Sequence, residues 1–221
     1  MTRLFLVLSV SLVCWTGARA ESLNLQPLKN WIANQGEIDT LTCDFTQERE
    51  LRTLKKPLVA DGRFWFKGPD QFRWELGAPA RSIAIHSGDV LTVVDVSKKK
   101  AEVTDTSGEE DERARFAAYF DLSFPRRWDT FTENFEVLAL NRVGEEWRAH
   151  VSPKSRKTVR GIKTMTFFIG VAEDNLLGFS LDLKDGSTIS TRFRKIKQNA
   201  AIPDSTFQVQ LEGYKVKRKK A

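Results

Sequence analysis

The alternation that decides the fold lies in residues 54–76, which read LKKPLVADGRFWFKGPDQFRWEL. Successive side chains of an extended chain point to opposite faces. Within Gly62–Lys67, the rings of Phe64 and Phe66 therefore share one side, and the other side carries Arg63, Trp65 and Lys67. This period of two predicts a strand with one apolar face.

The turn that follows is marked by Gly68, Pro69 and Asp70. Proline fixes its own φ angle and has no N–H to donate, so it is typical of a turn between strands. The apolar side then resumes in a second alternating run, at Phe72, Trp74 and Leu76. The stretch therefore predicts two neighbouring strands with an aromatic face that needs a cover or a ligand.

The first twenty residues have the pattern of a secretory signal peptide. Arg3 supplies a positive start, Leu4–Val13 an apolar run, and Ala18–Ala20 a small-residue cleavage site. The apolar run is too short to span a bilayer as a stable helix. We therefore expect cleavage after Ala20 and export of the mature chain.

The composition predicts one soluble domain, residues 21–214, followed by a basic tail at 215–221. The chain has 221 residues, of which 41% are hydrophobic and 29% charged. Loss of Arg3 and Arg19 with the signal peptide would lower the formal net charge from +6 to +4. The basic tail carries most of that excess, so no nucleic-acid surface is expected. We interpret the tail as a frayed terminus, or alternatively as a weak contact, through Lys217, Arg218, Lys219 and Lys220, with an anionic membrane or an acidic partner.

Further alternating runs predict strands along the rest of the chain. They are expected at residues 40–49, 82–86, 90–96, 101–104, 134–142, 147–151, 163–171, 176–184 and 187–197, with a last strand around 207–211. Turn signals such as Ser87-Gly88-Asp89 and Asp185-Gly186 separate several of them. Successive hairpins with one apolar face predict a mainly β protein built on a single antiparallel sheet.

Two helical segments are expected to cover this sheet. The first begins near Pro27, presents Leu28, Trp31 and Ile32 on one side and ends at Gly36. The second is predicted at 109–120, followed by an irregular stretch at 122–131. A sheet of about ten strands cannot stay flat, because strand twist makes it curl. We therefore predict an incomplete β-barrel whose concave face is covered by the N-terminal helix and the helical insertion.

The sequence offers no candidate catalytic residues, and we expect neither a metal site nor a cofactor. His86 and His150 lie in separate strand patterns without further ligands at metal spacing. Cys43, the single cysteine left after cleavage, lies in a strand pattern beside Phe45, which favours a buried thiol. The aromatic face is therefore the main indication of function, as ordinary core or as a cavity for apolar groups.

Several motifs together resemble the LolA family of periplasmic outer-membrane lipoprotein carriers. The most specific block is Gly62–Glu75. The other matching stretches are Phe45-Thr46-Gln47, Lys56-Pro57-Leu58, Ser87-Gly88-Asp89, Ala201-Ile202-Pro203-Asp204 with Phe207 and Val209, and Gly213-Tyr214.

This resemblance implies a monomeric carrier that binds the acyl chains of lipoproteins. It would receive them from an inner-membrane ABC transporter and deliver them to an outer-membrane acceptor. The cavity is expected to be lined by Phe45, Phe64, Phe66, Phe72, Trp74, Leu76, Ile83, Ile85, Leu91 and Val93. The helical lid would present Phe116, Ala117 and Phe120.

One position departs from the family pattern. Many members have an arginine directly before the turn proline that ties the barrel to its lid, whereas this chain has Gly68. Arg63 and Arg73 are expected to face outward, so we do not expect the same latch. Two alternatives to a carrier are a module of the same fold that senses lipid or peptide without transfer and, with least support, an exported hydrolase.

Overall fold

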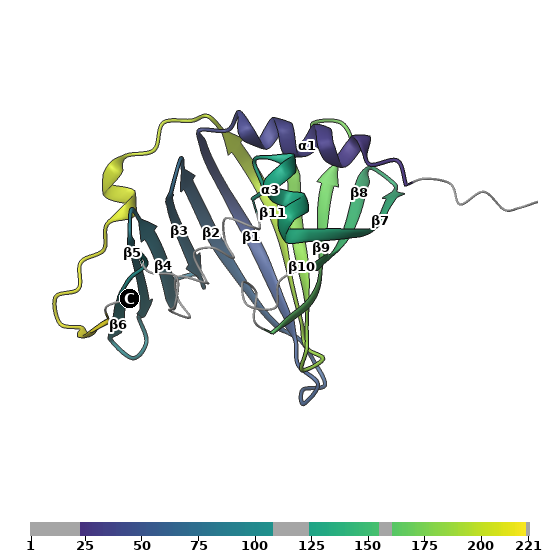
Figure 1. Cartoon of the computed structure of the whole chain (residues 1–221). Coiled ribbons are helices and arrows are strands. Elements are labelled where there is room, and N and C mark those ends of the chain that lie inside the picture. Colours follow the sequence, from purple (N-terminus) through teal and green to yellow (C-terminus); the bar gives the residue numbers. More distant parts are fainter. Residues whose placement is uncertain (1–22, 108–123, 155–160, 220–221) are drawn as a thin grey trace, which may run out of the picture.

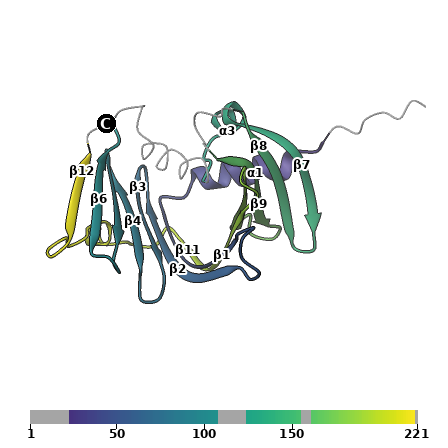
Figure 2. The ribbon, with the colours of Figure 1, turned by 90° about the horizontal axis from the view of Figure 1, so that it is seen from below.

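The computed structural model describes residues 23–107, 124–154 and 161–219. One large sheet curls around helices α1 and α3, which lie across its concave side (Figures 1 and 2). The helical elements are α1 (Gln26–Gly36), α3 (Trp128–Asn134) and the 3-10 helix η1 (Asp204–Phe207). The strands are β1 (Thr40–Glu50), β2 (Leu58–Lys67), β3 (Gln71–Leu76), β4 (Ser82–Ser87), β5 (Val90–Asp95), β6 (Lys100–Asp105), β7 (Phe135–Val143), β8 (Glu146–Pro153), β9 (Ile162–Gly170), β10 (Leu176–Leu183), β11 (Thr188–Gln198) and β12 (Lys215–Lys219).

The twelve described strands have the order β12-β6-β5-β4-β3-β2-β1-β11-β10-β9-β8-β7. Every neighbouring pair is antiparallel except β12 and β6, which run parallel. The two edge strands, β12 and β7, do not pair with each other, so the barrel stays open. The predicted fold class, a curled sheet forming an incomplete barrel, is confirmed. Within the described ranges, no helix has the length and hydropathy needed to cross a bilayer.

The C-terminal end differs from the prediction. The expected strand around 207–211 is wrong, because Phe207 ends η1 and the next strand is β12. Residues 215–219 are paired with β6 rather than frayed, and the Lys219 ammonium lies 2.9 Å from the Glu102 carboxylate. An edge strand can be polar on both faces, and lysines on it discourage further pairing. The basic pattern therefore did not signal a strand.

The inner face of the sheet, defined here as the face turned toward α1 and α3, carries the larger apolar cluster. Phe45 of β1 is fully buried, and its partner in the β1–β2 register is Gly62. The Phe45 ring lies over this glycine. A Cβ atom on Gly62 would lie 2.1 Å from the Phe45 ring, so the glycine makes room for it. The Phe45 ring reaches Trp74 of β3, with ring centroids 4.0 Å apart. Phe45 therefore ties three strands together.

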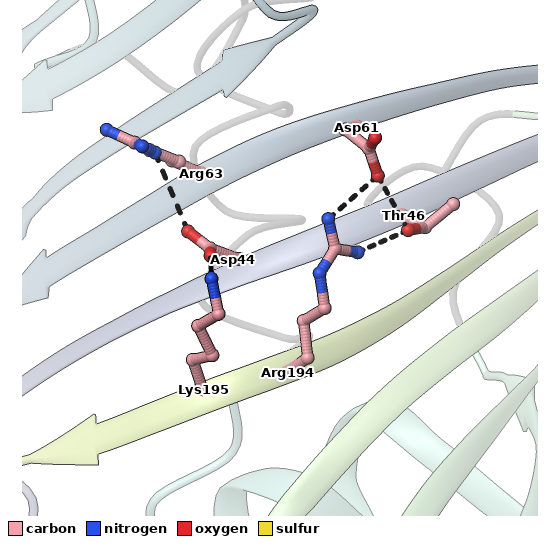
Figure 3. A network of polar contacts seen from close by, with 6 residues as sticks. All are labelled: Asp44, Thr46, Asp61, Arg63, Arg194 and Lys195. Carbon is pink, nitrogen blue, oxygen red and sulfur yellow. Dashed lines mark hydrogen bonds and ion pairs between the residues drawn. The ribbon is translucent and has the colours of Figure 1, made fainter.

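The outer face carries a charged network across β11, β1 and β2 (Figure 3). The β1–β11 register shifts between Thr42 and Asp44, and Lys195 has a φ of 53°. This bulge brings Arg194 and Lys195 to the same face. The Lys195 ammonium lies 3.0 Å from the Asp44 carboxylate. The Arg194 guanidinium lies 2.8 Å from the Asp61 carboxylate and also donates to the Thr46 hydroxyl.

Candidate functional site

A cavity of about 240 Å³ lies on the inner side, where three segments meet. These are the link from α1 to β1, the β2–β3 turn, and the chain from Phe124 to Phe135. The lining residues are Gln35, Ile38, Leu41, Phe66, Pro69, Asp70, Phe72, Phe124, Pro125, Arg126, Arg127, Thr130, Phe131 and Phe135. Apolar walls with a few polar groups are typical of small-molecule sites.

Two of the ten predicted cavity residues, Phe66 and Phe72, line this cavity. Six others belong to the inner cluster or pack against it without lining the cavity: Phe45, Phe64, Trp74, Leu76, Leu91 and Val93. Phe64, for example, is fully buried, and its ring lies 5.6 Å from that of Trp74. The centre of the inner face is therefore packed, and the open space lies toward its α1 end.

Ile83 and Ile85 were wrongly predicted as cavity residues. In the β3–β4 register they oppose Glu75 and Arg73, whereas Ala84 opposes Trp74. Directly opposed residues share a face, so both isoleucines point outward. There they pack in a second apolar cluster under the C-terminal segment, with Ile202 and Phe207. Strand β4 is apolar on both faces because both faces are covered, so alternation alone did not identify the inner one.

Phe124 is a site residue that the sequence reasoning missed. Its ring stacks on Phe64 at 5.2 Å with an interplanar angle of 18°, and on Phe193 at 6.1 Å. It therefore fills the space between β2 and β11 and also borders the cavity. Phe131 and Phe135 line the cavity as well, from α3 and the start of β7. The only sequence signal for these site residues was the high number of aromatic residues in 124–131. That segment was predicted to be irregular, whereas residues 128–134 form α3.

The predicted lid residues Phe116, Ala117 and Phe120 lie outside the described residues. The same holds for Lys220 and for the signal peptide, residues 1–20.

Arg126 joins the segment after the insertion to the end of α1. Its guanidinium donates hydrogen bonds to the carbonyl oxygens of Gly36 at 2.8 Å and Ile38 at 3.0 Å. It also lies over the Phe66 ring, 5.7 Å from the centroid. A Cβ atom on Gly68 would lie 3.1 Å from the Arg126 guanidinium, closer than nearly all such contacts. Gly68 therefore leaves room for an arginine that comes from a different segment.

The two arginines considered as substitutes lie on the outer face. The Arg63 side chain is 67% exposed and lies 3.6 Å from the Asp44 carboxylate. Arg73 lies 2.6 Å from the Glu75 carboxylate and donates to the carbonyl oxygens of Thr206 and Gln208. Arg73 thus holds the C-terminal segment on the outside, and neither arginine reaches the cavity.

Burial keeps the Cys43 thiol protonated and inert. Cys43 is 5% exposed within the inner cluster, and desolvation, followed by the nearby Asp44 charge, raises its pKa well above the usual range. The prediction of a buried structural thiol is confirmed.

A second hollow, of about 410 Å³, lies on the outer face beside the charged network. Its lining includes Asp44, Asp61, Arg63, Glu75 and Arg194. Placing an alkyl chain there would desolvate charges without any compensating contact. Compared with this charged hollow, the smaller cavity on the inner side is the better match for an apolar ligand.

A curled, open sheet with an apolar cavity on its concave side is an architecture suited to binding an apolar ligand. Comparison with known families gives the particular one. A family model described as "Outer membrane lipoprotein carrier protein LolA" matches residues 36–210, and the chain belongs to this family. The resemblance inferred from the sequence motifs is thereby confirmed.

The individual relatives share between 10% and 27% sequence identity with this chain. An outer-membrane lipoprotein carrier protein of Chromohalobacter salexigens is 27% identical over 174 residues, which cover 79% of this chain and 78% of that protein. An uncharacterised conserved protein of Thermus thermophilus has a similar fold, with a TM-score of 0.54 and 10% identity over 88% of this chain and 100% of that one. A LolA superfamily protein of Nitrosomonas europaea matches with a TM-score of 0.41 and 12% identity, over 82% of this chain and 97% of that one.

Proposed function

We propose that this protein is a periplasmic carrier that binds the acyl chains of lipoproteins in the inner-face cavity and carries them from the inner to the outer membrane. The proposal rests on the apolar cavity at the junction of α1, the β2–β3 turn and residues 124–135, in a member of the LolA family. In this scheme an inner-membrane ABC transporter donates the lipoprotein and an outer-membrane acceptor receives it. The carrier acts as a monomer after cleavage behind Ala20.

The energetics explain why such a carrier needs no chemistry. Each methylene group removed from water contributes about 0.8 kcal/mol, so an acyl chain does not cross an aqueous compartment unaided. A cavity lined by Phe66, Phe72 and Phe131 replaces water around the chain with aromatic carbon. Release then requires only that the acceptor bind the chain more tightly, or that the cavity close behind it.

The size of the cavity indicates that it must widen to take a full chain. Its 240 Å³ is below the range of about 300–1,000 Å³ found for pockets that bury drug-sized ligands. Phe124 and Arg126 lie on the same segment at its border, and movement of that segment would extend the cavity toward Phe64 and Phe193. We propose that this segment is the movable wall.

Binding of a fluorescent acylated peptide tests the proposal. Phe72→Glu introduces a charge into the cavity wall, and we expect at least tenfold weaker binding because that charge would be desolvated by the ligand. Phe66→Ala is a milder variant that keeps the wall apolar. Phe168→Ala is the matched control, since Phe168 is buried on the outer face under Arg192, whose guanidinium lies 3.5 Å from the ring centroid. Equal affinity in all three variants would contradict binding in this cavity.

Transfer distinguishes a carrier from a sensing module with the same cavity. Loaded protein is mixed with outer-membrane vesicles, and the lipoprotein is followed from the soluble to the membrane fraction. A carrier delivers it, whereas a module that binds acyl chains without transfer retains it. Mass spectrometry of the protein recovered from the periplasm tests cleavage after Ala20.

A further inference from the structure

The tip of the β1–β2 hairpin, residues 51–59, exposes apolar side chains. Leu54 is 46% exposed, Leu58 53% and Val59 60%. Single exposed apolar residues are normal on a soluble protein, but three within six residues form a local patch.

The geometry of the hairpin leaves this patch uncovered. The Leu54 N–H donates to the Leu51 carbonyl at 2.9 Å and closes the turn. Leu58 and Val59 are consecutive strand residues opposite Arg49 and Glu48, so they point to opposite faces of the ribbon. Strand β3 pairs with β2 only from Gly62 onward, so the ribbon extends beyond the sheet on that side. Figure 1 shows this tip projecting at the end of the sheet opposite α1.

The charged residues within the tip itself are all basic, and Glu48 and Glu50 of β1 adjoin it. Arg52, Lys55 and Lys56 alternate with the apolar residues, and residues 51–60 include no aspartate or glutamate. The nearest acidic residue on the adjacent β10–β11 turn, Asp185, accepts hydrogen bonds from the Ser187 N–H and hydroxyl. Apolar side chains interleaved with basic ones are typical of protein segments that bind the interface of an anionic bilayer.

We propose that the 51–59 tip docks on an anionic lipid bilayer. Leu54, Leu58 and Val59 enter the headgroup region, and the long side chains of Arg52, Lys55 and Lys56 reach the lipid phosphates. A lipid surface fits this patch better than a protein partner. A small projecting turn with apolar residues on both faces can enter the headgroup region, whereas a stable protein interface needs roughly 800 Å² from each partner.

Docking through the tip is separate from acyl-chain binding. Leu41, which lines the cavity, lies at the start of β1, and the tip follows its other end at Glu50. Nine residues of strand at about 3.3 Å each place the two roughly 30 Å apart. The protein would therefore stand on the bilayer with its cavity held away from the surface.

Co-sedimentation with lipid vesicles tests this proposal on the purified exported protein. The vesicles contain phosphatidylcholine alone, or phosphatidylcholine with one quarter phosphatidylglycerol. We expect binding to the anionic vesicles only, decreasing as salt is added. Lys55→Gln with Lys56→Gln, and separately Leu54→Ser with Leu58→Ser, should each weaken binding by on the order of tenfold.

The matched control is Lys217→Gln with Arg218→Gln on β12, a second exposed basic segment. It should bind vesicles normally, and all variants should keep their affinity for the acylated peptide, which also shows that they fold. The proposal is overturned if the unmodified protein does not bind anionic vesicles, if the tip variants bind as well as it does, or if only the β12 variant loses binding. None of these results would affect the proposed carrier function.

Discussion

At the scale of single residues, Phe124 and Arg126 determine how much of the inner face is open. Phe124 occupies the centre of the face between Phe64 and Phe193, and Arg126 fastens the same segment to the carbonyls after α1. Both side chains come from a stretch that the sequence reasoning left without regular structure. Phe124 fills part of the face where the sequence predicted a ligand, and Arg126 ties this segment to the end of α1.

Phe124→Ala is expected to enlarge the cavity. Removing a core phenylalanine costs about 3–5 kcal/mol of unfolding free energy, and Phe124 is only partly buried, so we expect about 1–3 kcal/mol. The space released adjoins the existing cavity, and binding of the acylated peptide should become tighter. Urea denaturation and fluorescence titration measure the two effects. Weaker binding by a folded variant would show that Phe124 is part of the ligand site rather than a filler.

Arg126→Gln is expected to loosen the segment at the cavity border. Hydrogen bonds from a charged donor contribute about 1.5–3 kcal/mol each, and this variant weakens two of them. We expect faster amide exchange at residues 36–38 and faster dissociation of the acylated peptide. The control is Arg142→Gln on β7, an exposed arginine that does not line the cavity. If both variants release the peptide at the unmodified rate, Arg126 is not a latch.

At the scale of elements, the sequence predicted α1 and most of the strands but not the short helix α3. Helix α1 and strands β1–β11 follow the predicted segments, because an apolar face against a polar one gives a clear period of two. The signal failed where that contrast disappears. Strand β4 is covered on both faces, so alternation did not show that Ile83 and Ile85 point outward. Strand β12 has mostly basic side chains and therefore no apolar face to detect. The segment that borders the cavity is fixed by contacts between residues distant in sequence, such as Phe124 and Phe64. Hydrophobic periodicity carries no information about such contacts.

The outer-face network predicts acid sensitivity of the β11-β1-β2 region. A hydrogen bond from Lys195 lowers the pKa of Asp44, and one from Arg194 lowers the pKa of Asp61. Carboxyls with a lower pKa in the folded state stabilise it above about pH 4, their pKa in the unfolded chain, and lose that contribution as pH falls through the folded-state values.

The double variant Asp44→Asn with Asp61→Asn should therefore unfold more easily than the unmodified protein at pH 7. The difference between the two should shrink below pH 4. Glu133→Gln, an exposed carboxylate on α3 outside the network, is the control. Denaturation curves between pH 2 and pH 7 give the comparison. A difference independent of pH would mean that packing, rather than charge, explains the loss.

At the scale of the whole molecule, the fold separates three surfaces. The inner face holds the cavity, the outer face holds the charged network and the C-terminal segment, and the hairpin tip projects beyond both. An open barrel suits a carrier because its covering segments can move without breaking the sheet. In the proposed carrier, the strands form the fixed wall and the chain around 124–127 forms the movable one.

Photocrosslinking from within the ligand tests the central claim most directly. A peptide with a photoreactive acyl chain is bound, irradiated and digested, and the modified residues are located by mass spectrometry. We predict modification within residues 66–72 and 124–135, which border the cavity. Modification confined to the outer face, or to the 51–59 tip, would contradict the assignment of the inner cavity as the acyl-chain site.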